Sequence, residues 1–115
     1  MKDDRLYFHH MLERCQRIAR FTSGGKESFL TSEALQDAII RNIEVIGEAA
    51  KRVSPEGRAC LAELDWKRIC GMRDVLIHDY IGVDLEQVWN VASLRIPELL
   101  LALGRFLGTG AEPRS

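Results

Sequence analysis

The chain has 115 residues, of which 46% are hydrophobic and 29% charged, and its formal net charge is −1. This balance predicts a globular protein with one core, and it excludes a disordered chain and a nucleic-acid binder that relies on a global excess of positive charge. No apolar run approaches the roughly 18 residues that span a bilayer, and residues 3 and 4 are acidic where a signal peptide has its apolar core, so we expect a cytoplasmic protein.

The first predicted helix covers residues 4–21, where apolar side chains recur on one side at helical spacing. Arg14, Arg17 and Arg20 form a basic ridge on this helix. The ridge is either an ordinary solvated face or a track for an RNA backbone, and the sequence leaves both interpretations open. Residues 22–25, TSGG, then end the helix.

A second helix is predicted from a cap at Thr31 or Ser32 to about Val53. Its apolar arc covers about half of the circumference, which is more than one neighbouring helix requires. We therefore expect this helix to pack against its own bundle and against a partner chain. Asn42 lies inside the apolar arc, and we interpret it first as an interhelix hydrogen-bonding residue and second as a supporting residue of a site.

The polar side of the same helix carries charges of both signs. The spacing of Asp37 from Arg41, and of Glu44 from Lys51, predicts two ion pairs along the helix. This side of the helix is therefore expected to face solvent.

Three further helices are predicted in the second half of the chain. A short helix begins at Ser54-Pro55-Glu56, another covers residues 66–77, and the last covers about 85–107. Pro97 lies inside the last helix and should kink or break it. Two aspartates are suited to cap the second and third of these helices: Asp65 and Asp84.

These elements predict an all-α protein, a compact four-helix bundle with one additional short helix. The bundle is expected to form a single domain over residues 1–110, with a frayed tail at 111–115. Three cysteines have apolar neighbours and are interpreted as reduced core residues: Cys15, Cys60 and Cys70. Cysteine and histidine spacings fit no ligand set, so the sequence predicts no metal and no cofactor.

Residues 71–81, GMRDVLIHDYI, hold the densest group of chemically active side chains. Arg73 and Tyr80 are seven residues apart and would share a helical face, whereas His78 would point away from both. For Arg73 and His78 to share a site, the helix must unwind near Ile77, or the two residues must come from different chains.

Arginine and histidine together suit the cleavage of RNA without a metal. That reaction needs a base for the ribose 2′-hydroxyl, an acid for the leaving oxygen and a cation for the phosphate. His78 can act as base or acid, and Arg73 offers a permanently charged fork to phosphate oxygens. A two-fold dimer would present two copies of each residue around one cleft, which favours a composite site. By itself, such a pattern belongs more often to an ordinary helix surface than to a catalytic site.

The motif at Arg73, His78 and Tyr80 resembles the R-x4-H-x-Y motif of the HepT-type HEPN proteins. Three other segments resemble the same family in the same order, namely residues 41–51 (RNIEVIGEAAK), 66–72 (WKRICGM) and 84–89 (DLEQVW). The resemblance covers roughly residues 5–107. It implies a HEPN-like fold.

The resemblance also implies a function. Such proteins are typically homodimeric toxins of type VII-like toxin–antitoxin pairs, and they cleave RNA without metal at a cleft between the chains. Arg73 and His78 correspond to the catalytic pair, with Asp74, Asp79 and Asn42 as supporting residues. The implied partner is an MntA-like minimal nucleotidyltransferase, the antitoxin, which transfers AMP from ATP to the motif tyrosine, here Tyr80.

Asp74 departs from the family pattern, because asparagine commonly follows the motif arginine. If the helix continues, Asp74 is four residues before His78 and would favour its protonated form, and it would oppose an incoming phosphate. Two alternatives therefore stay open. One is a non-catalytic HEPN binding module that docks a minimal nucleotidyltransferase and presents Tyr80. The other is a structural bundle in which the motif only joins helices.

Overall fold

The computed structural model describes residues 3–78 and 82–108, and the side chains of residues 75–78 lie outside that description. The helices are α1 (Asp4–Phe21), α2 (Gly25–Leu30), α3 (Glu33–Lys51), α4 (Pro55–Cys60), α5 (Trp66–Cys70), α6 (Met72–Leu76), α7 (Leu85–Asn90), a π-helical turn η1 (Val91–Arg95) and α8 (Ile96–Leu107). Two short strands are β1 (Ile77–His78) and β2 (Gly82–Val83).

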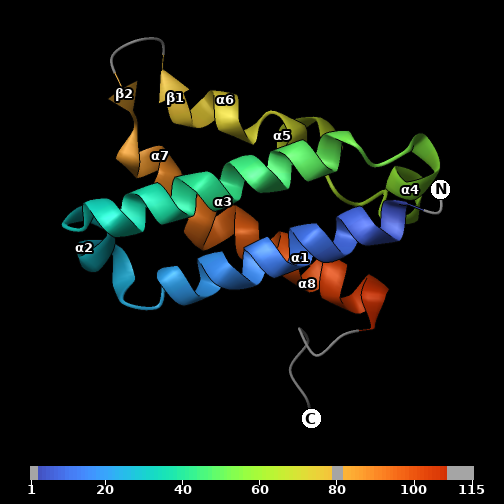
Figure 1. Ribbon diagram of the computed structural model, residues 1–115, viewed down its shortest axis with the longest axis horizontal. Helices are drawn as coiled ribbons and strands as arrows, with labels where there is room; N and C mark the ends of the chain where they lie inside the picture. The colour runs from blue at the N-terminus through green and yellow to red at the C-terminus, as the bar shows by residue number, and fades with distance from the viewer. Residues whose placement is uncertain (1–2, 79–81, 109–115) are drawn as a thin grey trace.

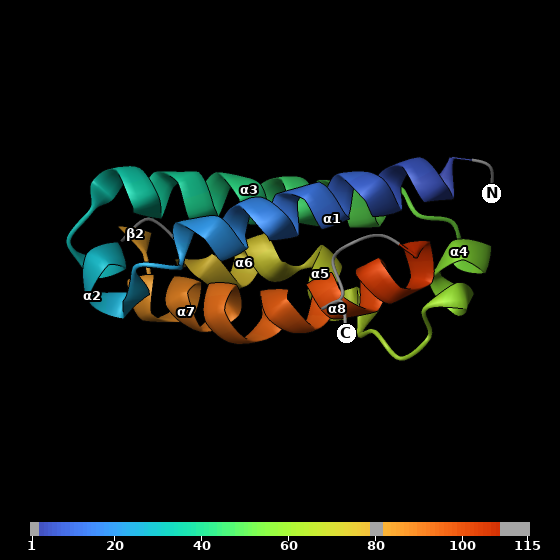
Figure 2. The same cartoon turned by 90° about the horizontal axis from the view of Figure 1, so that it is seen from below.

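The long helix α3 has a neighbour on each side. Figure 1 shows α1 along one flank of α3 and the α5–α6 segment along the other, while the run from α7 to α8 passes behind both long helices. Figure 2, seen from below, shows the α7–α8 run beneath α1 and α3. This is the predicted all-α bundle, with α1, α3, the α5–α6 segment and the α7–α8 run as its four parts.

Caps at the predicted serines and aspartates begin several of these helices. The Ser32 hydroxyl accepts a hydrogen bond from the Leu35 N–H at 3.1 Å and thereby starts α3. The Ser54, Asp65 and Asp84 side chains do the same for α4, α5 and α7. The left-handed Gly108, with φ +67°, caps the end of α8. The predicted tail at 111–115 lies outside the described residues.

The short helix α2 is absent from the sequence-based prediction, which ended the structured segment at residues 22–25. Gly25 begins α2 with φ +91°, a value that glycine adopts easily. Phe29 in α2 is fully buried, and its ring centroid lies 5.5 Å from that of Trp89 in α7. This contact joins two segments that are far apart in the sequence, and it holds α2 in place against α7.

The predicted single helix over residues 66–77 is instead two short helices and a strand. α5 ends at Cys70 and is capped by Gly71, whose N–H donates to the Lys67 carbonyl, and α6 starts directly after Gly71. At Ile77 the backbone becomes extended, and β1 pairs antiparallel with β2 through Ile77 opposite Val83 and His78 opposite Gly82.

The last helix is interrupted near Pro97, as its sequence predicted. The Ile96 N–H bonds to the Val91 carbonyl, five residues back, so residues Val91–Arg95 form a π turn. Pro97 has no N–H to donate, so widening the helix here costs no hydrogen bond at that position. The turn also leaves Leu94 exposed.

The core lies between the long helices and the α7–α8 run. Its fully buried side chains include Phe8, Ile18, Ile43, Ile46 and Leu103. Cys15 belongs to this core, and burial raises the pKa of its thiol. The prediction of three core cysteines was wrong for Cys60, which is exposed because α4 buries only Gly57, and Cys70 is half-buried.

A buried carboxylate joins the start of α1 to the start of α4. Asp4 accepts hydrogen bonds from the Ser54 N–H at 2.9 Å and the Ser54 hydroxyl at 2.5 Å. The same hydroxyl accepts from the Gly57 N–H at 3.0 Å. Because the hydrogen bonds from Ser54 favour the ionised carboxylate, the pKa of Asp4 lies below its ordinary value.

Over the described residues, no helix is long and apolar enough to cross a bilayer.

Candidate active site

The motif residues lie where α6 ends. Arg73 is on α6, which stops at Leu76, and His78 is in the extended segment β1. The backbone therefore unwinds at Ile77, the condition that a site shared by Arg73 and His78 within one chain requires. The side chain of His78 lies outside the described side chains, and Asp79 and Tyr80 lie outside the described residues.

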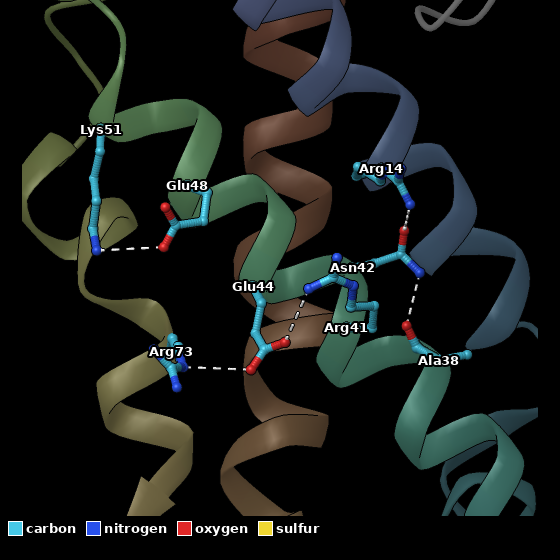
Figure 3. Close-up of polar contacts among 8 residues, drawn as sticks. All are labelled: Arg14, Ala38, Arg41, Asn42, Glu44, Glu48, Lys51 and Arg73. Atoms are coloured by element: carbon cyan, nitrogen blue, oxygen red, sulfur yellow. Dashed lines mark hydrogen bonds and ion pairs between the residues drawn. The ribbon is translucent and has the colours of Figure 1, made fainter.

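Arg73 is held from the neighbouring long helix. Its Nε lies 3.4 Å from Oε2 of Glu44 on α3, and 57% of the Arg73 side chain is exposed. Figure 3 shows Glu44 extending from α3 toward Arg73 on α6. The guanidinium group is thus fixed on its Nε side while much of its surface faces solvent.

Glu44 contacts a second arginine. Its other oxygen, Oε1, lies 3.7 Å from Nη1 of Arg41, and the Glu44 side chain is 25% exposed (Figure 3). The predicted ion pairs were therefore wrong in their partners, because Arg41 contacts Glu44 and Lys51 contacts Glu48 at 3.7 Å. Glu44 lies on the flank of α3 that faces α6. It therefore forms an ion pair with Arg73 and not with Lys51.

A close helix approach brings these residues together. Gly47 of α3 is buried, and a Cβ at this position would lie 3.6 Å from the carbonyl oxygens of Ile69 and Cys70. The C-terminus of α5 therefore lies against α3, and α6 continues from there past Glu44 (Figure 1).

Asn42 takes part in the predicted interhelix hydrogen bond. Its side chain is buried, its Oδ1 accepts from Arg14 Nη1 of α1 at 3.2 Å, and its Nδ2 donates to the Ala38 carbonyl at 2.7 Å. Figure 3 shows Arg14 on the opposite side of α3 from Arg73. Asn42 therefore ties α1 to α3, with no described contact to Arg73.

Asp74 is exposed on α6, and its N–H bonds to the Gly71 carbonyl at 3.0 Å. The sequence argument for an Asp74–His78 pair assumed that the helix continues to residue 78. Because α6 ends at Leu76, the four-residue helical spacing between the two does not apply.

A separate hollow of about 470 Å³ lies between the α5–α6 segment and the π turn with α8. Its lining is mixed, with apolar side chains and charges of both signs, including Arg68, Ile69, Met72, Leu94 and Glu98. No group of three or more histidine, cysteine, aspartate or glutamate side chains that could hold a metal ion is found within the part of the chain that the structure describes.

Sequence reasoning missed Glu44 as a residue of this site, because it placed Glu44 on a solvated helix face. The partner of Glu44 at the site, Arg73, is on another helix, so no spacing rule along one helix could pair them. The only signal in the sequence was that Glu44 lies within the segment 41–51 that resembles the family.

Comparison with known proteins points to one family. The family model of the HepT-like ribonucleases matches residues 11–105. A Methanocaldococcus jannaschii protein named "Gamma-glutamylcyclotransferase and putative RNase MJ0434" is 44% identical over 85% of this chain, which spans only 45% of that relative. "Putative RNase TTE0752" of Caldanaerobacter subterraneus is 39% identical over 86% of this chain and 89% of its own length.

"Probable ribonuclease HepT" of Thermococcus cleftensis is 36% identical over 81% of this chain and 86% of its own length. No solved structure matches the chain significantly. The family match covers most of the chain, including α3 and the Arg73–His78 segment on which the site depends. The chain therefore belongs to the HepT-like ribonuclease family.

Proposed function

We propose that this protein is an endoribonuclease toxin of a type VII-like toxin–antitoxin pair, and that it cleaves RNA in the cytoplasm without a metal ion. The observation that carries this proposal is the end of α6. Arg73 is exposed on α6 and fixed by Glu44, and the backbone leaves the helix at Ile77, one residue before His78. A phosphate-binding cation and an acid–base group thus lie close together in the chain without the orientation that a continuous helix would impose.

The proposed chemistry uses the RNA as its own nucleophile. A histidine removes the proton of the ribose 2′-hydroxyl, and the 2′-oxygen attacks the adjacent phosphorus. The bond from phosphorus to the 5′-oxygen breaks, and that oxygen takes a proton from a protonated histidine. The products are a 2′,3′-cyclic phosphate and a 5′-hydroxyl. Arg73 stabilises the negative charge that builds up on the phosphate oxygens.

This scheme favours a homodimer. One chain supplies one motif histidine, whereas the scheme uses one base and one acid. A two-fold dimer brings two copies of His78 and two of Arg73 to one cleft, so that one histidine removes a proton while the other supplies one.

The test of the ribonuclease is a cleavage assay in excess EDTA with a labelled single-stranded RNA. We expect the wild-type protein to release products with 2′,3′-cyclic phosphate ends. His78→Ala and Arg73→Ala should each lower the rate by at least about 100-fold, in the range for a lost acid–base group or charge-stabilising donor. Circular dichroism checks that both variants are folded. Equal cleavage by wild type and both folded variants would sink this site assignment.

We also propose that an MntA-like minimal nucleotidyltransferase regulates the toxin by transferring AMP to Tyr80. The phosphate of an AMP group held near Arg73 would compete with the RNA phosphate for its guanidinium group. We expect labelled ATP and such an enzyme to label the wild-type protein but not Tyr80→Phe, and we expect labelling to suppress RNA cleavage. Labelling of a protein that never cleaves RNA would instead favour the non-catalytic binding module.

A further inference from the structure

We propose that Arg41 and Glu44 of α3 extend the site beyond the R-x4-H-x-Y motif. Arg41 and Arg73 form a pair of guanidinium groups that binds neighbouring phosphates of one RNA strand, and Glu44 is the positioning residue of both. The inference rests on the proposed ribonuclease function for the identity of its ligand, a single-stranded RNA.

One carboxylate, that of Glu44, contacts both arginines of this cluster. Glu44 Oε2 lies 3.4 Å from Arg73 Nε, and Oε1 lies 3.7 Å from Arg41 Nη1. The two guanidinium groups therefore approach opposite oxygens of the same group and lie close to each other, although they come from different helices (Figure 3). Two positive charges share one negative charge, so this cluster keeps a net charge of +1 for an anion.

The three side chains differ in how much of each is exposed to solvent. Arg41 is 73% exposed and Arg73 57%, whereas Glu44 is only 25% exposed. The carboxylate is thus at the base of the cluster, and both cations have donors on the solvent side. A guanidinium group has five N–H donors, so one contact to Glu44 leaves several for a phosphate.

A second pair on the same helix shows what ordinary surface pairing looks like here. Lys51 and Glu48, one turn further along α3, are 3.7 Å apart, both are more than half exposed, and neither has a described contact to a third charge. Exposed pairs of this kind contribute little to stability. The Glu44 cluster differs because it joins two helices and includes the motif arginine.

Arg41 is tested by RNA binding in a protein that does not turn its substrate over. In the His78→Ala background, we expect Arg41→Ala to weaken binding of a fluorescent single-stranded RNA about tenfold, as for a lost charge-assisted contact. The slope of log affinity against log salt should fall in magnitude by about 0.7, the value for one phosphate contact on a single strand. Lys51→Ala, which removes a cation of the Glu48–Lys51 pair on the same helix, should leave both quantities at the His78→Ala values.

Glu44 is tested by separating binding from turnover. Glu44→Gln removes a carboxylate that competes with phosphate for both arginines, so RNA should bind as tightly as to wild type or more tightly. Arg73 then loses its ionic anchor, and we expect kcat to fall about tenfold. The matched control, Glu48→Gln, should change neither KM nor kcat, and the melting temperatures of all these variants should stay within about 2 °C of the wild type.

The outcomes separate this inference from the proposed ribonuclease. If the wild-type protein never cleaves RNA but Arg41→Ala lowers the affinity and the salt slope, the binding site stands and the nuclease fails. If the protein cleaves RNA and Arg41→Ala binds it with unchanged affinity and salt slope, Arg41 is no part of the site. A Glu44→Gln protein with wild-type kcat, or no measurable RNA binding by the wild type, overturns the proposal as well.

Discussion

Two carboxylates of this chain show how surroundings decide what one functional group does. Asp4 is buried and accepts two hydrogen bonds from Ser54, so it holds the N-terminus of α1 against that of α4. Glu44 is partly exposed and lies between two arginines. The first carboxylate contributes to stability through satisfied buried bonds, whereas the second contributes little and is free to organise a site.

The Asp4 contact leaves no room for a side chain at Gly57. A Cβ there would lie 2.5 Å from Asp4 Oδ2 and 2.8 Å from Cγ1 of Val53. We expect Gly57→Ala to lower the free energy of unfolding by about 1–3 kcal/mol, as overpacking does, measured by urea denaturation. Gly47→Ala is the control, because its Cβ would make only ordinary contacts at 3.6 Å. Equal stability of the two variants would contradict this account.

At the scale of elements, the sequence predicted those helices whose ends are set by residues nearby in the chain. The bounds of α1 at Asp4 and Phe21 follow from its apolar period and its terminal residues, and the serine and aspartate caps mark where α3, α4, α5 and α7 begin. The elements that the sequence did not predict depend on distant partners. The helix α2 needs the Phe29–Trp89 contact, and β1 needs β2.

The candidate site likewise has a part that the sequence predicted and a part that it did not. The pattern of Arg73 and His78 was visible in the sequence, and so were the two alternatives for a shared site, that the helix unwinds near Ile77 or that the two residues come from different chains. The role of Glu44 was not visible, because it depends on how α6 lies along α3. The ion pairs along α3 failed as predictions for the same reason, since each charged side chain on a helix has several possible partners and tertiary packing selects among them.

At the scale of the whole molecule, the site lies on an outer flank and not inside the bundle. α3 is covered by α1 on one side and by α5–α6 on the other, with the α7–α8 run behind (Figures 1 and 2). The exposed ends of Arg41 and Arg73 therefore remain available to a long RNA strand or to a second chain.

A mixture of the wild type with an inactive variant tests whether the site is shared between chains. If one cleft uses His78 of both chains, a mixed dimer of wild-type and His78→Ala chains has one histidine and is inactive. Equal mixing with full subunit exchange should then leave roughly a quarter of the cleavage rate of wild-type dimers at the same total concentration. A mixture that keeps roughly half of that rate, although mass spectrometry shows mixed dimers, would place a complete site within one chain.

The π turn at Val91–Arg95 determines where the final helix can lose a residue without turning its buried face away from the core. A π turn holds one residue more than the α turn it replaces, and the helices on both sides keep their buried faces toward the core. Loss of a residue elsewhere in the run from Leu85 to Leu107 would rotate one face by about 100° and expose it. Loss of a residue within the π turn would leave both faces in phase. An alignment gap in the final helix of a relative is therefore compatible with this fold at the π turn and disruptive on either side of it.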